Sequence, residues 1–442
     1  MSHFGHYDKP PLTYWLTALA FRCFGQTEWA ARLTPLAGAC MTLAGLAWAA
    51  WRWYGRQTAW WAVLLCGTMG QFWLLARFLT PDMLLTGACT LAIAAWAEAR
   101  ARQGHWGFWA LGVLCWSVAW WTKGTAALAP LGGLAAGLVA CGEAAGRKAL
   151  RLPLALLLVL ALGLPWYIWL ITQYPELTGF FLGRELVGRI AGHPDGRQGP
   201  VYYHLLVILA AWWPWLPVIG VAALLKRKLF LRSGWRGIPS GLGLEGWIVL
   251  TGLVFYSLIS SKLPTYTLPL APWAALLLAR ALLRLRGALR GRDFRWLVGA
   301  PTAVAVAVYV GAAIVAPRFE ARLRLNSSLR PVSAELRRRG AQTVLLDRYW
   351  AGVEFYFGHR VHYVVGREPR QRQGETGFCP AIGNTHFCAP EHWQERVSRT
   401  PRPGIWLVHY SKYPQSPFRE FIERSLPSDR VTVGHFLLVR VR

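Results

Sequence analysis

Long apolar runs constrain this chain more than any other feature of its sequence. About ten of them recur between residues 30 and 316, and most approach the length at which a helix crosses the hydrocarbon core of a bilayer. We therefore predict an all-α polytopic membrane domain over residues 1–317. An amphipathic helix over residues 12–24 is expected to lie at the membrane interface before the first span. The expected spans cover residues 30–51, 58–79, 83–97, 106–121, 126–140, 153–171, 203–225, 246–260, 268–285 and 296–316.

Composition supports a membrane protein and excludes several other classes. Hydrophobic residues make up 54% of the 442 residues and charged residues only 16%, whereas an average soluble domain carries roughly 25% charged residues. This composition, with 26 Trp and 44 Gly, excludes a disordered chain, a coiled coil and a small disulfide scaffold. The net charge of +27 fits either a nucleic-acid binder or basic loops that face anionic lipid. The apolar runs decide for the membrane, so we expect membrane lipid and no nucleic acid as partner.

The connections between the apolar runs alternate in charge, which predicts the topology. By the positive-inside rule, the basic connections face the cytoplasm. The other connections then lie on the external side, together with everything after residue 317. The basic connections contain residues 52–56, 100–102, 147–151, 226–236 and 284–295, and the external ones contain residues 77–82, 121–124, 172–200 and 260–266.

The last part of the chain, residues 318–442, has the composition of a soluble domain. A helical stretch at residues 331–339 precedes strand-like runs at residues 343–346, 361–365, 404–409 and 436–441. We predict a small α/β domain outside the cell membrane.

Two cysteines in this part, Cys379 and Cys388, differ from the other six, which lie in apolar or amphipathic stretches. Residues 380–387 between them include Pro, Gly and Asn and can turn back on themselves. Because the external compartment of a Gram-negative cell is oxidising, we favour a disulfide between the two. The alternatives are two free thiols, or a metal site shared with His386 and His392.

Ionisable residues gather in the predicted external loops, at or just above membrane depth. Lys9 precedes two prolines, which hold it extended; Asp82 opens a span, and Lys123 lies between two short spans. An ionisable group at this depth is a candidate for function. The alternatives are an ordinary Lys–Pro turn, a helix-starting Asp and a snorkelling Lys.

Two further loops, residues 185–200 and 260–266, combine cations with other polar groups beside the membrane surface. Such a set suits a polyphosphate or a phosphate-linked lipid. No phosphate-cradling glycine loop, zinc-protease motif or nucleophile elbow occurs in the sequence. The candidate residues in these loops are Arg189, His193, Arg197, Lys262 and Tyr266.

Several of these motifs together resemble one known superfamily. Across residues 8–285 their order is similar to that in the bacterial polyprenyl-phosphate-dependent glycosyltransferases, which include protein O-mannosyltransferases and aminoarabinose (lipid A) transferases and have the GT-C fold. Each motif alone is weak, but five in order on one side of the membrane make the resemblance specific. The five matching motifs are residues 9–16 with 28–32, 81–83, 122–124, 199–203 with 214–215, and 261–266 with 268–270.

The resemblance implies an inverting sugar transfer on the external face of the bacterial inner membrane. The donor would be a polyprenyl-phosphate-linked sugar, and the favoured acceptor is lipid A or another envelope glycan. Asp82 would accept or orient the proton of the acceptor hydroxyl, and Lys9 would neutralise charge on the leaving phosphate. The implied phosphate-binding residues are Lys9, Arg189, Arg197, Lys262 and Tyr266, and further site candidates are Asp8, Lys123 and His193.

This chain departs from the family pattern at its start. Family members usually begin with one more helix and an Asp-Glu pair, and both are expected to be missing here, which leaves Asp82 as the matching acid. We favour a reaction without a cofactor, with a divalent metal held by Asp8 and His193 as the alternative. Other functions considered are a protein O-mannosyltransferase-like enzyme, a lipid-linked sugar flippase or transporter, and a catalytically silent binding protein.

Overall fold

The computed structural model consists of two compact units, residues 9–309 and residues 310–442. The division falls inside one long helix, and the predicted domain boundary at residue 317 stays a prediction. We describe each unit by itself. The structure describes residues 9–141, 151–175, 177–188, 199–216, 218, 220, 238–286, 291–320, 329–347, 356, 361–365, 387–388, 394, 404–410, 418–433 and 435–441.

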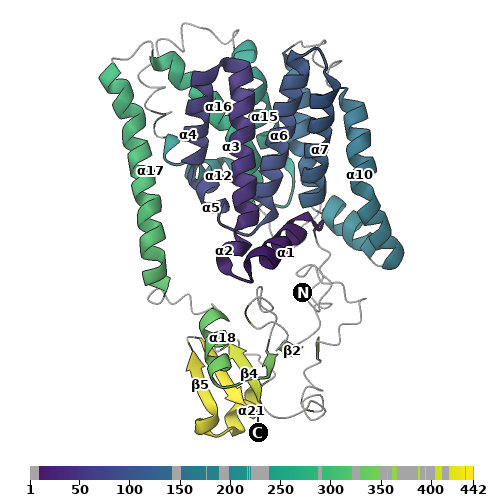
Figure 1. Cartoon of the computed structure of the whole chain (residues 1–442), viewed down its shortest axis with the longest axis vertical. Coiled ribbons are helices and arrows are strands. Elements are labelled where there is room, and N and C mark those ends of the chain that lie inside the picture. Colours follow the sequence, from purple (N-terminus) through teal and green to yellow (C-terminus); the bar gives the residue numbers. More distant parts are fainter. Residues whose placement is uncertain are drawn as a thin grey trace. The chain divides into compact units, whose positions relative to one another are not determined.

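The first unit is helical, and several of its long helices run side by side (Figure 1). The helix predicted for the membrane interface is α1 (Leu12–Phe24). The other elements are α2 (Glu28–Ala31), α3 (Leu33–Tyr54), α4 (Arg56–Gly67), α5 (Gly70–Leu75), α6 (Pro81–Ala101), α7 (Trp106–Lys123), η1 (Gly124–Ala127), α8 (Leu128–Ala140), α10 (Leu152–Gln173), η2 (Gly179–Gly188), α12 (Tyr203–Ala211), α15 (Ile238–Leu258), η5 (Pro264–Leu270), α16 (Ala271–Arg286) and α17 (Gly291–Glu320).

Helix α6 lies in the core of this unit, between α3 and α7 (Figure 1). Small residues permit its close contact with α3: a Cβ on Gly87 would lie 2.4 Å from the carbonyl oxygen of Gly38. On the α7 side, the rings of Trp96 and Trp116 stack with centroids 5.4 Å apart. Because both faces are packed, the two ends of α6 are held firmly, and one of them carries the predicted acid.

Five helical segments among the described residues are long and apolar enough to cross a membrane. The prediction of about ten spans is therefore not confirmed in number. The run over residues 58–79 is divided into α4 and α5. The outer helices α10 and α17 have mostly exposed apolar surfaces, with only 22% and 11% of their apolar windows buried inside the unit, as expected for lipid-facing helices. The five segments are Glu28–Tyr54, Trp106–Ala140, Leu152–Gln173, Pro264–Leu283 and Phe294–Val315.

The second unit contains a six-stranded sheet in the order β3-β2-β1-β4-β6-β5. The first four strands in this order are parallel, and β6 and β5 pair antiparallel. Four strands coincide with predicted strand-like runs. Two were not predicted: β3 has only two residues, and β5 is a short strand of four residues in which polar and apolar residues alternate. The strands are β1 (Thr343–Leu346), β2 (Val361–Val365), β3 (Phe387–Cys388), β4 (Ile405–Tyr410), β5 (Arg430–Val433) and β6 (Phe436–Arg440), with helices α18 (Leu329–Arg338) and α21 (Arg419–Arg424).

Candidate active site

Two of the predicted residues, Asp82 and Lys123, form a buried ion pair. Asp82 follows Pro81 in the first turn of α6, and Lys123 is the last residue of α7. Lys123 Nζ donates to Asp82 Oδ1 at 2.5 Å, and the two side chains are 8% and 7% exposed. A charge-assisted hydrogen bond of this kind is strong because little water competes for it. The fold thus joins two motifs that lie 41 residues apart.

A third predicted residue, Tyr266 in η5, lies against this pair. Lys123 Nζ is 5.2 Å from the centroid of the Tyr266 ring, within the range of a cation–π contact. The ring of Tyr266 also packs on that of Tyr256, with centroids 5.6 Å apart. We call Asp82, Lys123 and Tyr266 the central cluster.

Lys9 lies in a second ion pair, at the start of the described chain. Its Nζ is 3.2 Å from Glu185 Oε2 in η2, and the side chains are 19% and 21% exposed. This pair is therefore more accessible to solvent and ligands than the central cluster. The sequence motif predicted a functional Lys9, but it did not predict Glu185 as the partner.

Gly124 lies between the central cluster and the Lys9–Glu185 pair. It follows Lys123 with φ +59°, and a Cβ there would lie 2.4 Å from Tyr167 Oη and 3.9 Å from Pro10 Cγ. Because an L side chain is strained at this φ and would collide with Tyr167, the Lys123–Gly124 turn requires glycine. The Lys–Gly motif is thus a requirement of backbone geometry beside the site.

Lys262 is buried and its ammonium group is hydrogen-bonded. Its Nζ donates to the carbonyl oxygens of Tyr256, Ser257 and Ile259, at 3.2, 2.6 and 2.7 Å. These carbonyls lie at the end of α15, where helix carbonyls lack partners within the helix. Burial lowers the pKa of Lys262. The predicted contact of Lys262 with phosphate stays a prediction, and it would require one of these bonds to break.

Among the remaining predicted residues, Asp8, Arg189, His193, Arg197 and Cys379 lie outside the described residues. Cys388 is in β3, and its disulfide stays a prediction. Within the described ranges, no group of three or more His, Cys, Asp and Glu side chains could hold a metal ion. The metal site at Asp8 and His193 stays a prediction, because both residues lie outside the described residues.

Sequence reasoning missed two residues that hold the segment carrying Tyr266. Gln71 Nε2 donates to the carbonyl oxygen of Pro264 at 2.8 Å and to Thr267 Oγ1 at 2.9 Å. His204, which is fully buried, lies against the Tyr266 ring. In the sequence, Gln71 and His204 stand out only as polar residues inside apolar runs. That pattern does not show which residue either side chain contacts.

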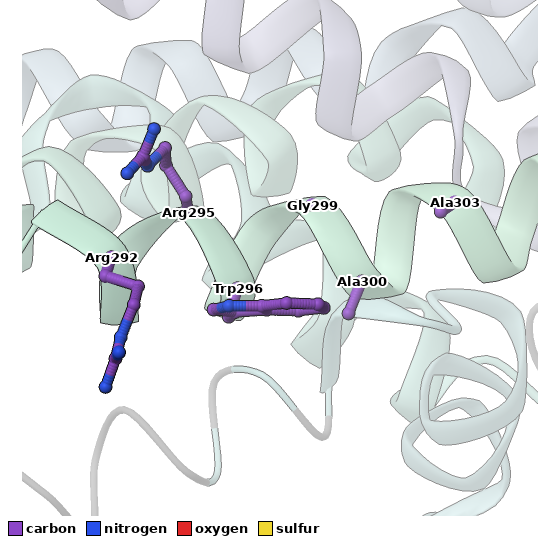
Figure 2. A pocket seen from close by; sticks show the side chains of 6 residues that line it. All are labelled: Arg292, Arg295, Trp296, Gly299, Ala300 and Ala303. Atoms are coloured by element: carbon purple, nitrogen blue, oxygen red, sulfur yellow. The ribbon is translucent and has the colours of Figure 1, made fainter.

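A surface pocket of about 370 Å³, the size of a small ligand site, lies along α17, away from the predicted residues. Figure 2 shows that Arg292 and Arg295 point in different directions from the helix. The two cations therefore do not converge on one anion, and we do not assign a site there. The described lining residues are Arg292, Arg295, Trp296, Gly299, Ala300 and Ala303.

Comparison with solved structures shows the fold. ArnT from Cupriavidus metallidurans in the apo state superposes with a TM-score of 0.71 at 20% identity, over 99% of this chain and 88% of ArnT. ArnT from the same organism bound to undecaprenyl phosphate gives 0.68 at 19% identity, with the same coverage. The chain has the ArnT fold. The GT-C architecture expected from the motifs is thereby confirmed.

Sequence comparisons extend this ArnT likeness. Residues 8–169 match the family described as dolichyl-phosphate-mannose-protein mannosyltransferase. The undecaprenyl phosphate-alpha-4-amino-4-deoxy-L-arabinose arabinosyl transferase of Enterobacter sp. (strain 638) is 29% identical over 287 residues, which are 62% of this chain and 49% of that protein. The corresponding transferase 2 of Sodalis glossinidius (strain morsitans) is 31% identical over 290 residues, 62% and 50% of the two chains. The predicted resemblance is confirmed, and the chain spans about half the length of these relatives.

Proposed function

We propose that this protein is an integral-membrane, inverting glycosyltransferase. It moves a sugar from a polyprenyl-phosphate carrier to lipid A or another envelope glycan, on the external face of the bacterial inner membrane. The observation that carries the proposal is the buried Asp82–Lys123 pair beside Tyr266. The similarity to aminoarabinose transferases supports the choice of donor and acceptor.

The reaction needs an acid–base group and a cation, and the site offers both. Asp82 accepts the proton of the acceptor hydroxyl or orients that hydroxyl, and Lys123 holds the carboxylate in place. The sugar leaves its carrier phosphate as the new glycosidic bond forms, so negative charge grows on the phosphate. Lys9 stabilises that charge with Arg189 or Arg197, and Tyr266 holds the lipid phosphate.

A transfer assay tests this assignment. Purified protein is supplied with undecaprenyl-phosphate-linked aminoarabinose and lipid A, and modified lipid A is quantified by mass spectrometry. Asp82→Asn should lower turnover by about 10²- to 10⁴-fold, the range for loss of an acid–base group. Glu98→Gln is the matched control, because Glu98 is also a buried, ion-paired carboxylate of α6. A wild-type protein that transfers no sugar to any acceptor would contradict the proposal.

A protein acceptor is the second candidate, and the match to the protein mannosyltransferase family favours it. The same assay separates the two. Transfer of mannose from a polyprenyl-phosphate carrier to a Ser/Thr-containing peptide, without modification of lipid A, would assign the protein to that class. Modification of lipid A alone would exclude it.

The proposal requires the sites to face away from the cytoplasm. We assign the basic connections to the cytoplasm and residues 318–442 to the exterior, by the positive-inside rule. A reporter that is active only after export, fused after Arg442, should be active. Activity of a cytoplasm-only reporter at the same position would reverse the orientation, and the proposed site would then lie on the wrong side of the membrane.

A further inference from the structure

His204 connects α12 to the segment that carries Tyr266. Its side chain is fully buried, and Nε2 lies 3.3 Å from the carbonyl oxygen of Leu263. Because a carbonyl only accepts, Nε2 carries the proton and donates. We call residues 262–267 the elbow. The imidazole thus holds the elbow backbone three residues before Tyr266.

The same ring also packs on the Tyr266 side chain. The two rings are nearly parallel, with an interplanar angle of 23° and centroids 6.1 Å apart. On another side the His204 ring lies 6.0 Å from that of Tyr256, which itself packs on Tyr266. The rings of His204 and Tyr256 therefore both pack against the Tyr266 ring. Lys123 Nζ lies over the same Tyr266 ring, 5.2 Å from its centroid.

Packing alone does not explain an imidazole at this position. His204 Nδ1 is buried and has no hydrogen-bond partner among the described residues. An unpaired buried polar atom costs free energy that a phenyl or aliphatic side chain would not cost. The donation to Leu263 is the interaction that distinguishes His204 from a hydrophobic residue of similar size.

Gln71 provides a useful contrast. It holds the elbow from α5, by the carbonyl of Pro264 and the hydroxyl of Thr267. His204 is connected both to the elbow backbone, through Leu263, and to the Tyr266 ring, through stacking. A residue that contacts both the backbone and the ring can set the position and the orientation of that ring.

We infer that His204 is a positioning residue for sugar transfer, which orients Tyr266 against the Asp82–Lys123 pair. The inference rests on the proposed function, because Tyr266 is taken there to hold the lipid phosphate. His204 itself contacts no reacting group. It acts through Tyr266 alone, and that property can be tested.

The test compares His204→Ala, His204→Gln and His204→Phe in the transfer assay, with the full chain in lipid nanodiscs. Gln retains an N–H donor, and Phe retains a stacking ring. We expect Ala to lower kcat/KM for the donor by about 10- to 100-fold, the size of effect that misplacement of a site group causes. Gln and Phe should each restore part of that loss. Ile208→Ala, one turn along α12 at a buried position, controls for lost packing.

A double-mutant cycle separates positioning from general stability. In a Tyr266→Ala background, adding His204→Ala should change kcat/KM by less than twofold, because the group through which His204 acts is already absent. Hydrogen exchange of residues 263–267 should rise in His204→Ala and not in Ile208→Ala. The inference is overturned if His204→Ala retains wild-type kcat/KM, or if its loss is undiminished in the Tyr266→Ala background. A wild-type protein without transfer activity overturns the proposed function, and the inference with it.

Discussion

The two ends of α6 each carry a buried carboxylate, and the two carboxylates are paired in different ways. Near the carboxyl end, Glu98 is held by Arg52 and Arg102, each at 2.6 Å on a different oxygen, and by Trp48 Nε1 at 3.4 Å. At the amino end, Asp82 is paired with Lys123, and both side chains are buried. The two arginines that hold Glu98, Arg52 and Arg102, are 40% and 58% exposed, so both guanidinium groups are partly hydrated.

This difference indicates which end is structural and which is suited to chemistry. A carboxylate bound on both oxygens by two arginines has little capacity left for a substrate proton. A carboxylate held mainly by one ammonium can exchange that contact during a reaction. Variants at the two ends, and at the residues around them, should show whether this difference is real.

Removing the cation from the amino-end pair should have the largest effect on stability. Lys123→Met leaves Asp82 buried without its ammonium partner, which should cost about 3–5 kcal/mol of unfolding free energy. Arg52→Met should cost less than about 1 kcal/mol, because Arg52 is 40% exposed and Glu98 keeps Arg102 as a cationic partner. Chemical denaturation in detergent micelles compares the two variants. Equal losses would contradict the distinction between the two ends.

Removing Lys9 should affect turnover more than stability. The Lys9–Glu185 pair is partly exposed, so its loss should leave folding nearly intact. If Lys9 contacts the leaving phosphate, Lys9→Ala should cost roughly 2–4 kcal/mol of transition-state stabilisation. Arg22→Ala, an exposed cation at the end of α1, is the control and should retain wild-type turnover. Wild-type turnover in Lys9→Ala would remove Lys9 from the site.

The turn after Lys123 should tolerate no side chain. Gly124→Ala places a Cβ at φ +59° and 2.4 Å from Tyr167 Oη, so it should cost at least about 1–2 kcal/mol from backbone strain alone. Gly132→Ala in α8 meets nothing within 4 Å and should be neutral or slightly stabilising. Thermal unfolding of both variants checks the difference. A Gly124→Ala protein as stable as Gly132→Ala would show that the turn adapts.

The smallest effect concerns Glu335, a counterpart of Glu98 in the second unit. Glu335 is also bound by two arginines, Arg338 and Arg339, whose hydrogen bonds lower its pKa from 4.5 to about 2. Because the folded-state pKa is depressed, the stabilisation is present above pH 4.5 and is lost as pH falls towards 2. When the pH is lowered from 5 to 3, the melting temperature of Glu335→Gln should therefore fall less than that of the wild type. An identical pH dependence in the two proteins would show that solvent screens the pair.

Comparison of expected and observed elements shows where local sequence is sufficient. Helix α1 and the strands β1 and β2 have the predicted bounds, because amphipathic and β-branched patterns are local properties. The run over residues 58–79 was expected as one helix, but the structure breaks it between α4 and α5. At this break, residues distant in the sequence supply hydrogen bonds to Thr68. Tyr309 Oη donates to the backbone carbonyl of Thr68, and Trp215 Nε1 donates to the Thr68 hydroxyl.

Apolar length and motif spacing are properties of short segments, so the order of residues predicts the helical membrane class, the residue types of the candidate site and the loops that carry them. The pairing of Asp82 with Lys123, the contact of Lys9 with Glu185 across 176 residues, and the stacking of His204 on Tyr266 arise only when the helices pack together. Each of these contacts depends on which helix faces which. That choice is made by packing over the whole unit, as in the contact of Gly38 with Gly87, and no short segment encodes it.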